Sequence, residues 1–137
     1  MDNKIKHLEM IHGVINRMAS NSFMLKGLAV TLVTGIFALS EKDADKLYFL
    51  VAAIPIVAFW CLDAYYLLQE RLYRSLYEKV RCTNEKDIDF SLKATTAEFG
   101  NDKNNFCKCL FSKTIMLFYC PLVAVCAAII ALKSLLL

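Results

Sequence analysis

The sequence has little charge. Asp, Glu, Lys and Arg make up 21% of its 137 residues, whereas hydrophobic residues make up 58%. A chain this short and apolar excludes a soluble catalytic domain combined with three membrane passages. It contains no HExxH, no GxSxG and no phosphate-binding glycine loop, and no pair of carboxylates is placed to face each other in a pocket. A formal net charge of +3 is also too small to indicate a nucleic-acid-binding face. We therefore expect no enzyme activity, no cofactor and no nucleic-acid partner.

The sequence also lacks the signs of a disulfide framework or a metal site. Half of its cysteines lie in apolar stretches and half on the side expected to face the cytoplasm, where thiols stay reduced. Cys107 and Cys109 form a CxC pair without a second pair or a nearby histidine, which favours small, half-buried residues over a metal site. His7 and His12 are expected to be solvated or packed imidazoles. The cysteines are Cys61, Cys82, Cys107, Cys109, Cys120 and Cys126.

Three apolar stretches dominate what is present, at 22–40, 47–68 and 114–132. Each is close to the length of about 20 residues that a helix needs to cross a bilayer. The stretches predict an all-α membrane protein with three transmembrane helices. Residues 1–20 carry charges throughout and lack an apolar core, so we do not expect a cleavable signal peptide.

The remaining sequence predicts helices that continue outside the bilayer, within a single domain over 1–137. Residues 3–20 have apolar side chains at steps of three and four, which is typical of an amphipathic helix. This helix is expected to lie on the membrane surface, to pack on another helix, or to run on into the first span. The second helix keeps its four-residue register to residue 81, so we expect a helix at 47–81 that spans the bilayer and then extends into the cytoplasm. A connector at 82–104 and a helix at 105–135 follow, with kinks at Pro55 and Pro121.

The distribution of basic residues predicts the topology. Segments 1–26 and 69–113 hold four and nine of the 16 lysines and arginines, whereas the short connector at 41–46 is net acidic. By the positive-inside rule, both basic segments face the cytoplasm. We expect the N-terminus inside, the 41–46 loop outside and the C-terminus outside.

Two charges fall within the first two apolar stretches at matching depth. The short connector makes these spans antiparallel neighbours, and folding about residue 43 or 44 places residue i opposite about residue 87 minus i. Lys26 then lies within one turn of Asp63, and Arg17 lies at the level of Glu70. A lone charge in the bilayer costs about 2.5–3.5 kcal/mol, so the sequence favours two ion pairs. The alternatives are that Lys26 extends to the headgroups while Asp63 meets interfacial water, or that the charges have a gating or proton-linked role.

A stripe of small residues follows one side of the first span. Such stripes allow close approach of helices in lipid, so we favour helix packing. The alternative is that the hydroxyl groups line a water-filled path in an oligomer. Phe59, Trp60, Tyr65 and Tyr66 are expected to form an interfacial aromatic belt. The stripe consists of Gly27, Thr31, Thr34 and Gly35.

The segments HLEMIHGVINRMASNSFMLKG (7–27) and FWCLDAYYLLQERLYR (59–74) carry a resemblance. The chain resembles a family of small bacterial inner-membrane proteins of unassigned biochemistry. Its architecture is loosely similar to that of pore-forming effectors of bacterial antiphage systems, which make the inner membrane leaky. This likeness implies antiviral defence as a function but assigns no residues.

Three functional hypotheses follow. The leading one is an oligomeric inner-membrane channel or membrane-disrupting effector, whose cytoplasmic helices respond to a protein partner or a small signalling ligand. The second is a non-conducting membrane anchor that recruits a cytoplasmic partner. The third is an ion-coupled transporter that depends on Asp63.

Overall fold

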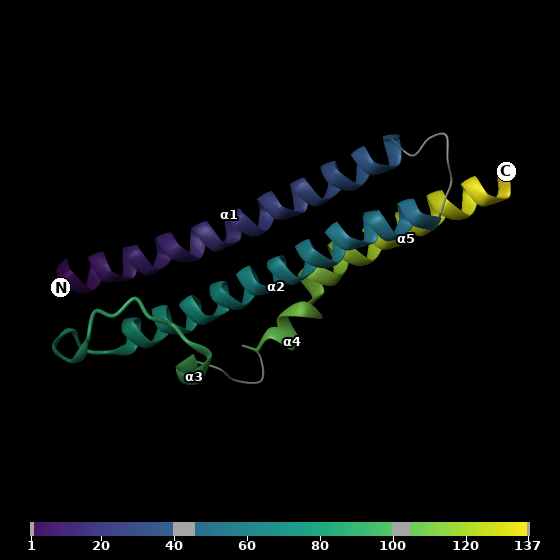
Figure 1. Ribbon diagram of the computed structural model, residues 1–137. Helices are drawn as coiled ribbons and strands as arrows, with labels where there is room; N and C mark the ends of the chain where they lie inside the picture. Colours follow the sequence, from purple (N-terminus) through teal and green to yellow (C-terminus); the bar gives the residue numbers. More distant parts are fainter. Residues whose placement is uncertain (1, 40–45, 100–104, 137) are drawn as a thin grey trace.

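The computed structural model describes residues 2–39, 46–99 and 105–136, all of whose regular elements are helical (Figure 1). The all-α prediction is confirmed, and three of the helices are long and apolar enough to cross a membrane. Residues 41–45 of the predicted 41–46 loop and residues 100–104 of the predicted connector lie outside the described residues, and Lys46 is the first residue of α2. The elements are α1 (Asp2–Leu39), α2 (Lys46–Cys82), the 3-10 helix η1 (Glu85–Asp87), α3 (Thr96–Phe99), α4 (Phe106–Leu110) and α5 (Lys113–Leu136).

The predicted amphipathic helix and the first span form one continuous helix. α1 has 38 residues and passes through Ser20, Asn21 and Ser22 without a break. Of the three arrangements expected for residues 3–20, the structure has the one in which the helix runs on. α2 has 37 residues and extends past its apolar part to Cys82. At 1.5 Å per residue, each helix is roughly 55 Å long, which is almost twice the thickness of the hydrocarbon core.

α1 and α2 lie side by side as an antiparallel hairpin (Figure 1). Their contact is made by apolar side chains at steps of three and four, which place them on one face of each helix. The contact continues beyond the apolar stretches of the two helices. Near the N-terminal end of α1, both helices contribute buried residues, and these stabilise that part of the hairpin. The buried residues of this contact are Ile11, Ile15 and Val33 of α1 and Ile56, Leu68, Leu72, Leu76 and Val80 of α2.

The helix predicted at 105–135 is interrupted. α4 starts after Asn105, whose side chain accepts a hydrogen bond of 2.7 Å from the backbone N–H of Lys108, as an N-cap does. α4 ends at Leu110, and α5 restarts at Lys113 with a 2.9 Å hydrogen bond from Met116 N–H to the Ser112 carbonyl. Ser112 therefore begins a second helix where a single one was expected.

Pro55 and Pro121 both lie inside continuous helices, α2 and α5. The helices accommodate the missing backbone donors without ending there. A bend at either proline stays a prediction.

Most of the apolar surface of the long helices is left uncovered by the chain itself. In the most apolar window of each long helix, only 11%, 22% and 17% of the residues are buried. Large apolar side chains such as Phe23 and Leu117 are 79% and 75% exposed. Exposed apolar surface of this extent is not stable in water and fits contact with lipid.

Candidate functional site

The central feature of the structure is a buried polar cluster of Ser22, Lys26 and Asp63. Lys26 Nζ lies 2.6 Å from Asp63 Oδ2 and donates a second hydrogen bond, 2.8 Å long, to Ser22 Oγ. The Ser22 hydroxyl donates to Asp63 Oδ1. Both carboxylate oxygens therefore have a donor, although the Asp63 side chain is fully buried. The structure brings together the two charges that the register of the hairpin placed at the same depth.

The helical period explains how the cluster forms. Ser22 and Lys26 are four residues apart, so they lie on the same face of α1, the face that also buries Ala29 and Val33. Ser22 was not among the site residues expected from the sequence. Its position one turn before a lysine in an apolar stretch was the available signal, because such a hydroxyl can bind whichever charge meets that lysine.

The third long helix covers the cluster. Lys26 Nζ lies 5.9 Å from the ring centroid of Phe118 on α5, and the Lys26 side chain keeps only 18% of its surface exposed. The ammonium group thus has a carboxylate on one side and, at cation–π distance, an aromatic ring on another. The arrangement differs from a lysine that extends freely to the headgroups.

Two aromatic residues attach α5 to α2 beside the cluster. The rings of Trp60 and Tyr119 are stacked at 5.7 Å with an interplanar angle of 4°. Tyr119 donates a 3.1 Å hydrogen bond to the Phe59 carbonyl, and the Trp60 indole donates one of 2.9 Å to the Leu110 carbonyl at the end of α4. Trp60 thus joins three helices, and its place in an interfacial belt stays a prediction. Tyr119 was not singled out from the sequence.

The second expected ion pair does not form between the helices. Glu70 accepts hydrogen bonds of 2.8 and 3.2 Å from Arg74, one turn further along α2. Among the described residues, no ion pair joins Arg17 to Glu70, and Arg17 lies on an exposed side of α1. The register of the hairpin predicts the depth of Arg17 along the helix axis. It does not predict on which side of the helix the Arg17 side chain lies. Arg74 lies four residues from Glu70 on the same helix, so the two residues pair without a contact between helices.

The small-residue stripe faces away from α2, and only Thr34 borders the space between α1 and α5. A Cβ atom added at Gly27 or Gly35 would meet nothing within 4 Å. Thr31 and Thr34 are exposed, and the Thr31 hydroxyl donates to the Gly27 carbonyl of its own helix at 2.9 Å. The stripe therefore plays no part in the packing of α1 on α2. It is available to a partner outside the chain.

The connector is attached to the N-terminal turns of α1. Lys4 Nζ donates hydrogen bonds of 3.0 and 2.9 Å to the carbonyls of Arg81 and Thr83 at the end of α2. His7 Nε2 lies 3.1 Å from the Ser91 carbonyl, which makes Nε2 the donor, and the His7 ring is 5.4 Å from that of Phe90. His7 is only 3% exposed, so it is the packed imidazole of the two expected histidine states.

Phe90 has a φ angle of 57°, in the left-handed region. A bulky residue adopts this conformation only where other contacts hold it there. Its contact with His7 is one such interaction. The N-terminal turns of α1 thus fix the path of the connector.

The cysteines form no metal-binding group in the described part of the chain, where no cluster of three or more His, Cys, Asp or Glu residues is found. Cys107 is exposed, whereas Cys109 is fully buried with its sulfur 3.7 Å from Arg71 Nη1. Burial raises the pKa of the Cys109 thiol, and the nearby Arg71 guanidinium opposes that shift. Cys109 is therefore a packed, unreactive thiol at neutral pH.

These features define a helical protein with three candidate membrane spans, joined by one buried polar cluster. Comparisons with protein families, curated proteins and solved structures gave no match to the chain.

Proposed function

We propose that the chain is a non-enzymatic, homo-oligomeric channel or membrane-disrupting effector of the bacterial inner membrane, controlled through its cytoplasmic helices. The observation that carries this proposal is the exposed face of α1 formed by Gly27, Thr31, Thr34 and Gly35. Small residues and hydroxyl groups at bilayer depth favour close contact between helices of separate copies, or contact with water in a path between them.

Several copies are needed because one copy encloses no conducting path. The space between α1 and α2 is filled by Ala29, Val33 and Ile56, all at most 5% exposed. Tyr119 fills the corresponding position on α5 and is fully buried. A path between copies would instead use the uncovered faces of the helices.

The two long helices offer a mechanism of control. Each helix is continuous from the end of the molecule that holds Lys4 and His7 into the candidate span. A movement of that end therefore also moves the part of the helix in the span. A partner or ligand that displaces the connector from His7 would therefore tilt α1 and α2 together. An antiphage role would require such a trigger during infection.

The experiment that tests assembly uses glycines with matched surroundings. Gly27→Leu and Gly35→Leu each place a bulky side chain on the stripe, and Gly13→Leu places it on the same helix away from the stripe. A Cβ atom added at any of the three glycines meets nothing within 4 Å, so each position is open to a side chain in the single chain. We expect the stripe variants to lose the oligomer mass in a lipid nanodisc and Gly13→Leu to keep it. Equal masses for all three variants would contradict assembly through this face.

Conduction is tested separately. Thr31→Val with Thr34→Val removes both hydroxyl groups and keeps the side-chain volume, so we expect oligomers of normal mass with lower ion flux in liposomes. Thr96→Val, on α3, is the control. Unchanged flux in the double variant would show that these hydroxyl groups do not line the path.

A membrane anchor is the second candidate function, favoured by exposed apolar residues near the N-terminus. Ile5 and Met10 are 49% and 54% exposed on α1, where a cytoplasmic partner could bind them. Ile11 and Leu72, by contrast, are buried in the hairpin and serve its folding. Under this function, Ile5→Asp with Met10→Asp abolishes partner capture, and Gly27→Leu has no effect on it.

A further inference from the structure

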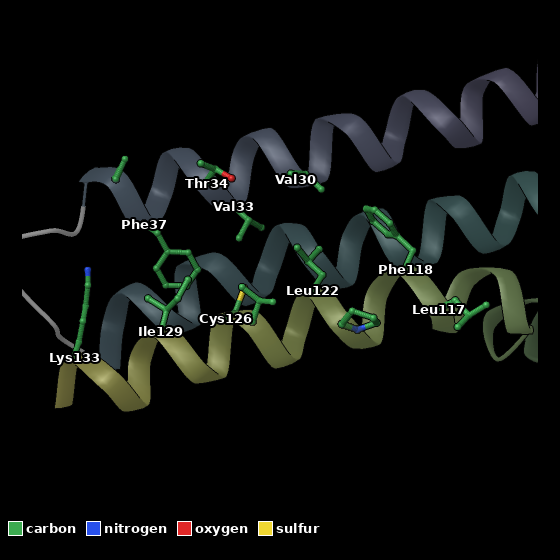
Figure 2. Close-up of a pocket in the computed structure, with 13 residues that line it drawn as sticks. Val30, Val33, Thr34, Phe37, Leu117, Phe118, Leu122, Cys126, Ile129 and Lys133 are labelled. Atoms are coloured by element: carbon green, nitrogen blue, oxygen red, sulfur yellow. The ribbon is translucent and has the colours of Figure 1, made fainter. Parts of the chain in front are cut away.

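A groove of about 740 Å³ separates α1 from α5, within the candidate spans. Both helices pack against α2 but leave a gap between their facing sides (Figure 2). Val33 and Cys126 form the buried floor, at 4% and 2% exposure. Val30 and Val125 on the two walls are 42% and 56% exposed, so the groove is open along its side. Its volume lies within the range of about 300–1,000 Å³ that is typical of ligand sites.

The two ends of the groove differ in chemistry. At one end, Leu117 and Phe118 line the groove, and Phe118 lies beside Lys26 of the buried polar cluster. At the other end, Phe37 and Ile129 extend toward each other, and the side chain of Lys133 rises from the last turn of α5 (Figure 2). The groove is therefore lined by apolar side chains apart from Thr34, with Lys133 at the end that lies nearest the C-terminus of α5.

These dimensions fit a single lipid chain. From Phe118 to Lys133, α5 rises roughly 22 Å at 1.5 Å per residue, whereas one leaflet contributes about 15 Å of hydrocarbon. An acyl chain that enters at the boundary fits lengthwise, and a lysine at a helix end places its ammonium group at the level of the headgroups.

We propose that this groove binds one acyl chain of a glycerophospholipid, with the phosphate of that lipid beside Lys133. The proposal depends on the placement of the helices in a bilayer and is independent of conduction. A second copy of the chain is the competing occupant. Of the stripe residues, Thr34 lines the α1 wall of the groove, whereas Gly27, Thr31 and Gly35 do not, so copies that assemble through those three leave the α5 wall open to lipid.

Two valines on α5 provide a matched test. Val125→Trp fills the groove, whereas Val123→Trp, two residues away on the same helix, adds the same side chain at an exposed position outside it. Protein extracted in a mild detergent is titrated with phosphatidylglycerol and examined by native mass spectrometry. We expect one bound phospholipid per chain in the wild type and in Val123→Trp, and loss of that lipid in Val125→Trp.

Val30→Trp fills the groove from the α1 wall and carries the test if Val125→Trp does not fold. Equal lipid retention in groove and control variants would overturn the proposal. The proposal would also be overturned if the groove variants lost a second copy of the chain that the wild type binds and lost no lipid.

The role of Lys133 is tested by headgroup preference. Phosphatidylglycerol and phosphatidylcholine with the same acyl chains differ in net charge, so we expect the wild type to favour the anionic lipid about fivefold, the ratio that one lysine near a membrane surface supplies. Lys133→Gln should remove the preference and keep binding of the acyl chain. A preference that persists in Lys133→Gln would place the phosphate elsewhere and overturn that part of the proposal.

Discussion

Removal of one charge from the buried cluster is expected to have an asymmetric effect on stability. Lys26→Met leaves the Asp63 carboxylate fully buried without its ammonium partner, although the Ser22 hydroxyl still donates to it. Loss of one partner from a buried ion pair destabilises a protein by about 3–5 kcal/mol. Asp63→Leu leaves Lys26, whose side chain is 18% exposed and long enough to reach the interface. We expect this second variant to lose less than about 2.5 kcal/mol, the lower end of the insertion cost of a charge.

The double variant separates pairing from independent effects. Lys26→Met with Asp63→Leu replaces both charges by apolar groups, which is often neutral or stabilising. We expect its free energy of unfolding to lie within about 1 kcal/mol of the wild type, far from the sum of the two single effects. The charge swap Lys26→Asp with Asp63→Lys should likewise restore part of the membrane-protein yield that Lys26→Asp loses.

The measurement is reversible unfolding in mixed detergent micelles. Trp60 is the single tryptophan of the chain, lies three residues from Asp63 and stacks on Tyr119, so its fluorescence reports the separation of the helices. Single-variant effects that simply add in the double variant would refute pairing. A larger loss in Asp63→Leu than in Lys26→Met would refute the argument from burial.

Two further predictions concern the end of the molecule that holds the N-terminus. His7→Ala removes the hydrogen bond to Ser91, worth about 1 kcal/mol, and should speed amide hydrogen exchange in 88–92, whereas the exposed His12→Ala should not; equal rates in both variants would show that His7 does not hold the connector. At pH 7, Cys107 should react with a maleimide while Cys109 does not, because burial raises the pKa of Cys109 and keeps it a protonated thiol; equal labelling of the folded protein would contradict its burial.

The sequence predicts the depth of residues in the hairpin better than their direction around it. Lys26 and Asp63 meet because the buried face of α1 happens to carry Lys26, whereas Arg17, at the correct depth, lies on an exposed side. A register derived from loop position cannot distinguish these two cases. The helical period of Ile11 and Ile15 does distinguish them, since it marks the buried face of α1.

Contacts between segments distant in sequence were the least predictable. The hydrogen bond of His7 to Ser91 depends on the path of an irregular connector, which has no period to read. The break between α4 and α5, by contrast, had local signals, since Asn105 and Ser112 are both favoured residues at helix starts. The outward direction of the Gly27 stripe follows from the face that buries Ala29 and Val33, once the partner helix is known.

The most direct test of the three-span arrangement determines on which side of the membrane the C-terminal ends of α2 and α5 lie. In a variant without other cysteines, Cys82 alone or an introduced Ser134→Cys alone is treated with a membrane-impermeant maleimide on intact spheroplasts. Both positions are exposed on the structure. We predict labelling of Ser134→Cys in intact spheroplasts and labelling of Cys82 only after the membrane is opened. Labelling of both positions before the membrane is opened would contradict the crossing by α5, and labelling of Cys82 alone would contradict the predicted orientation.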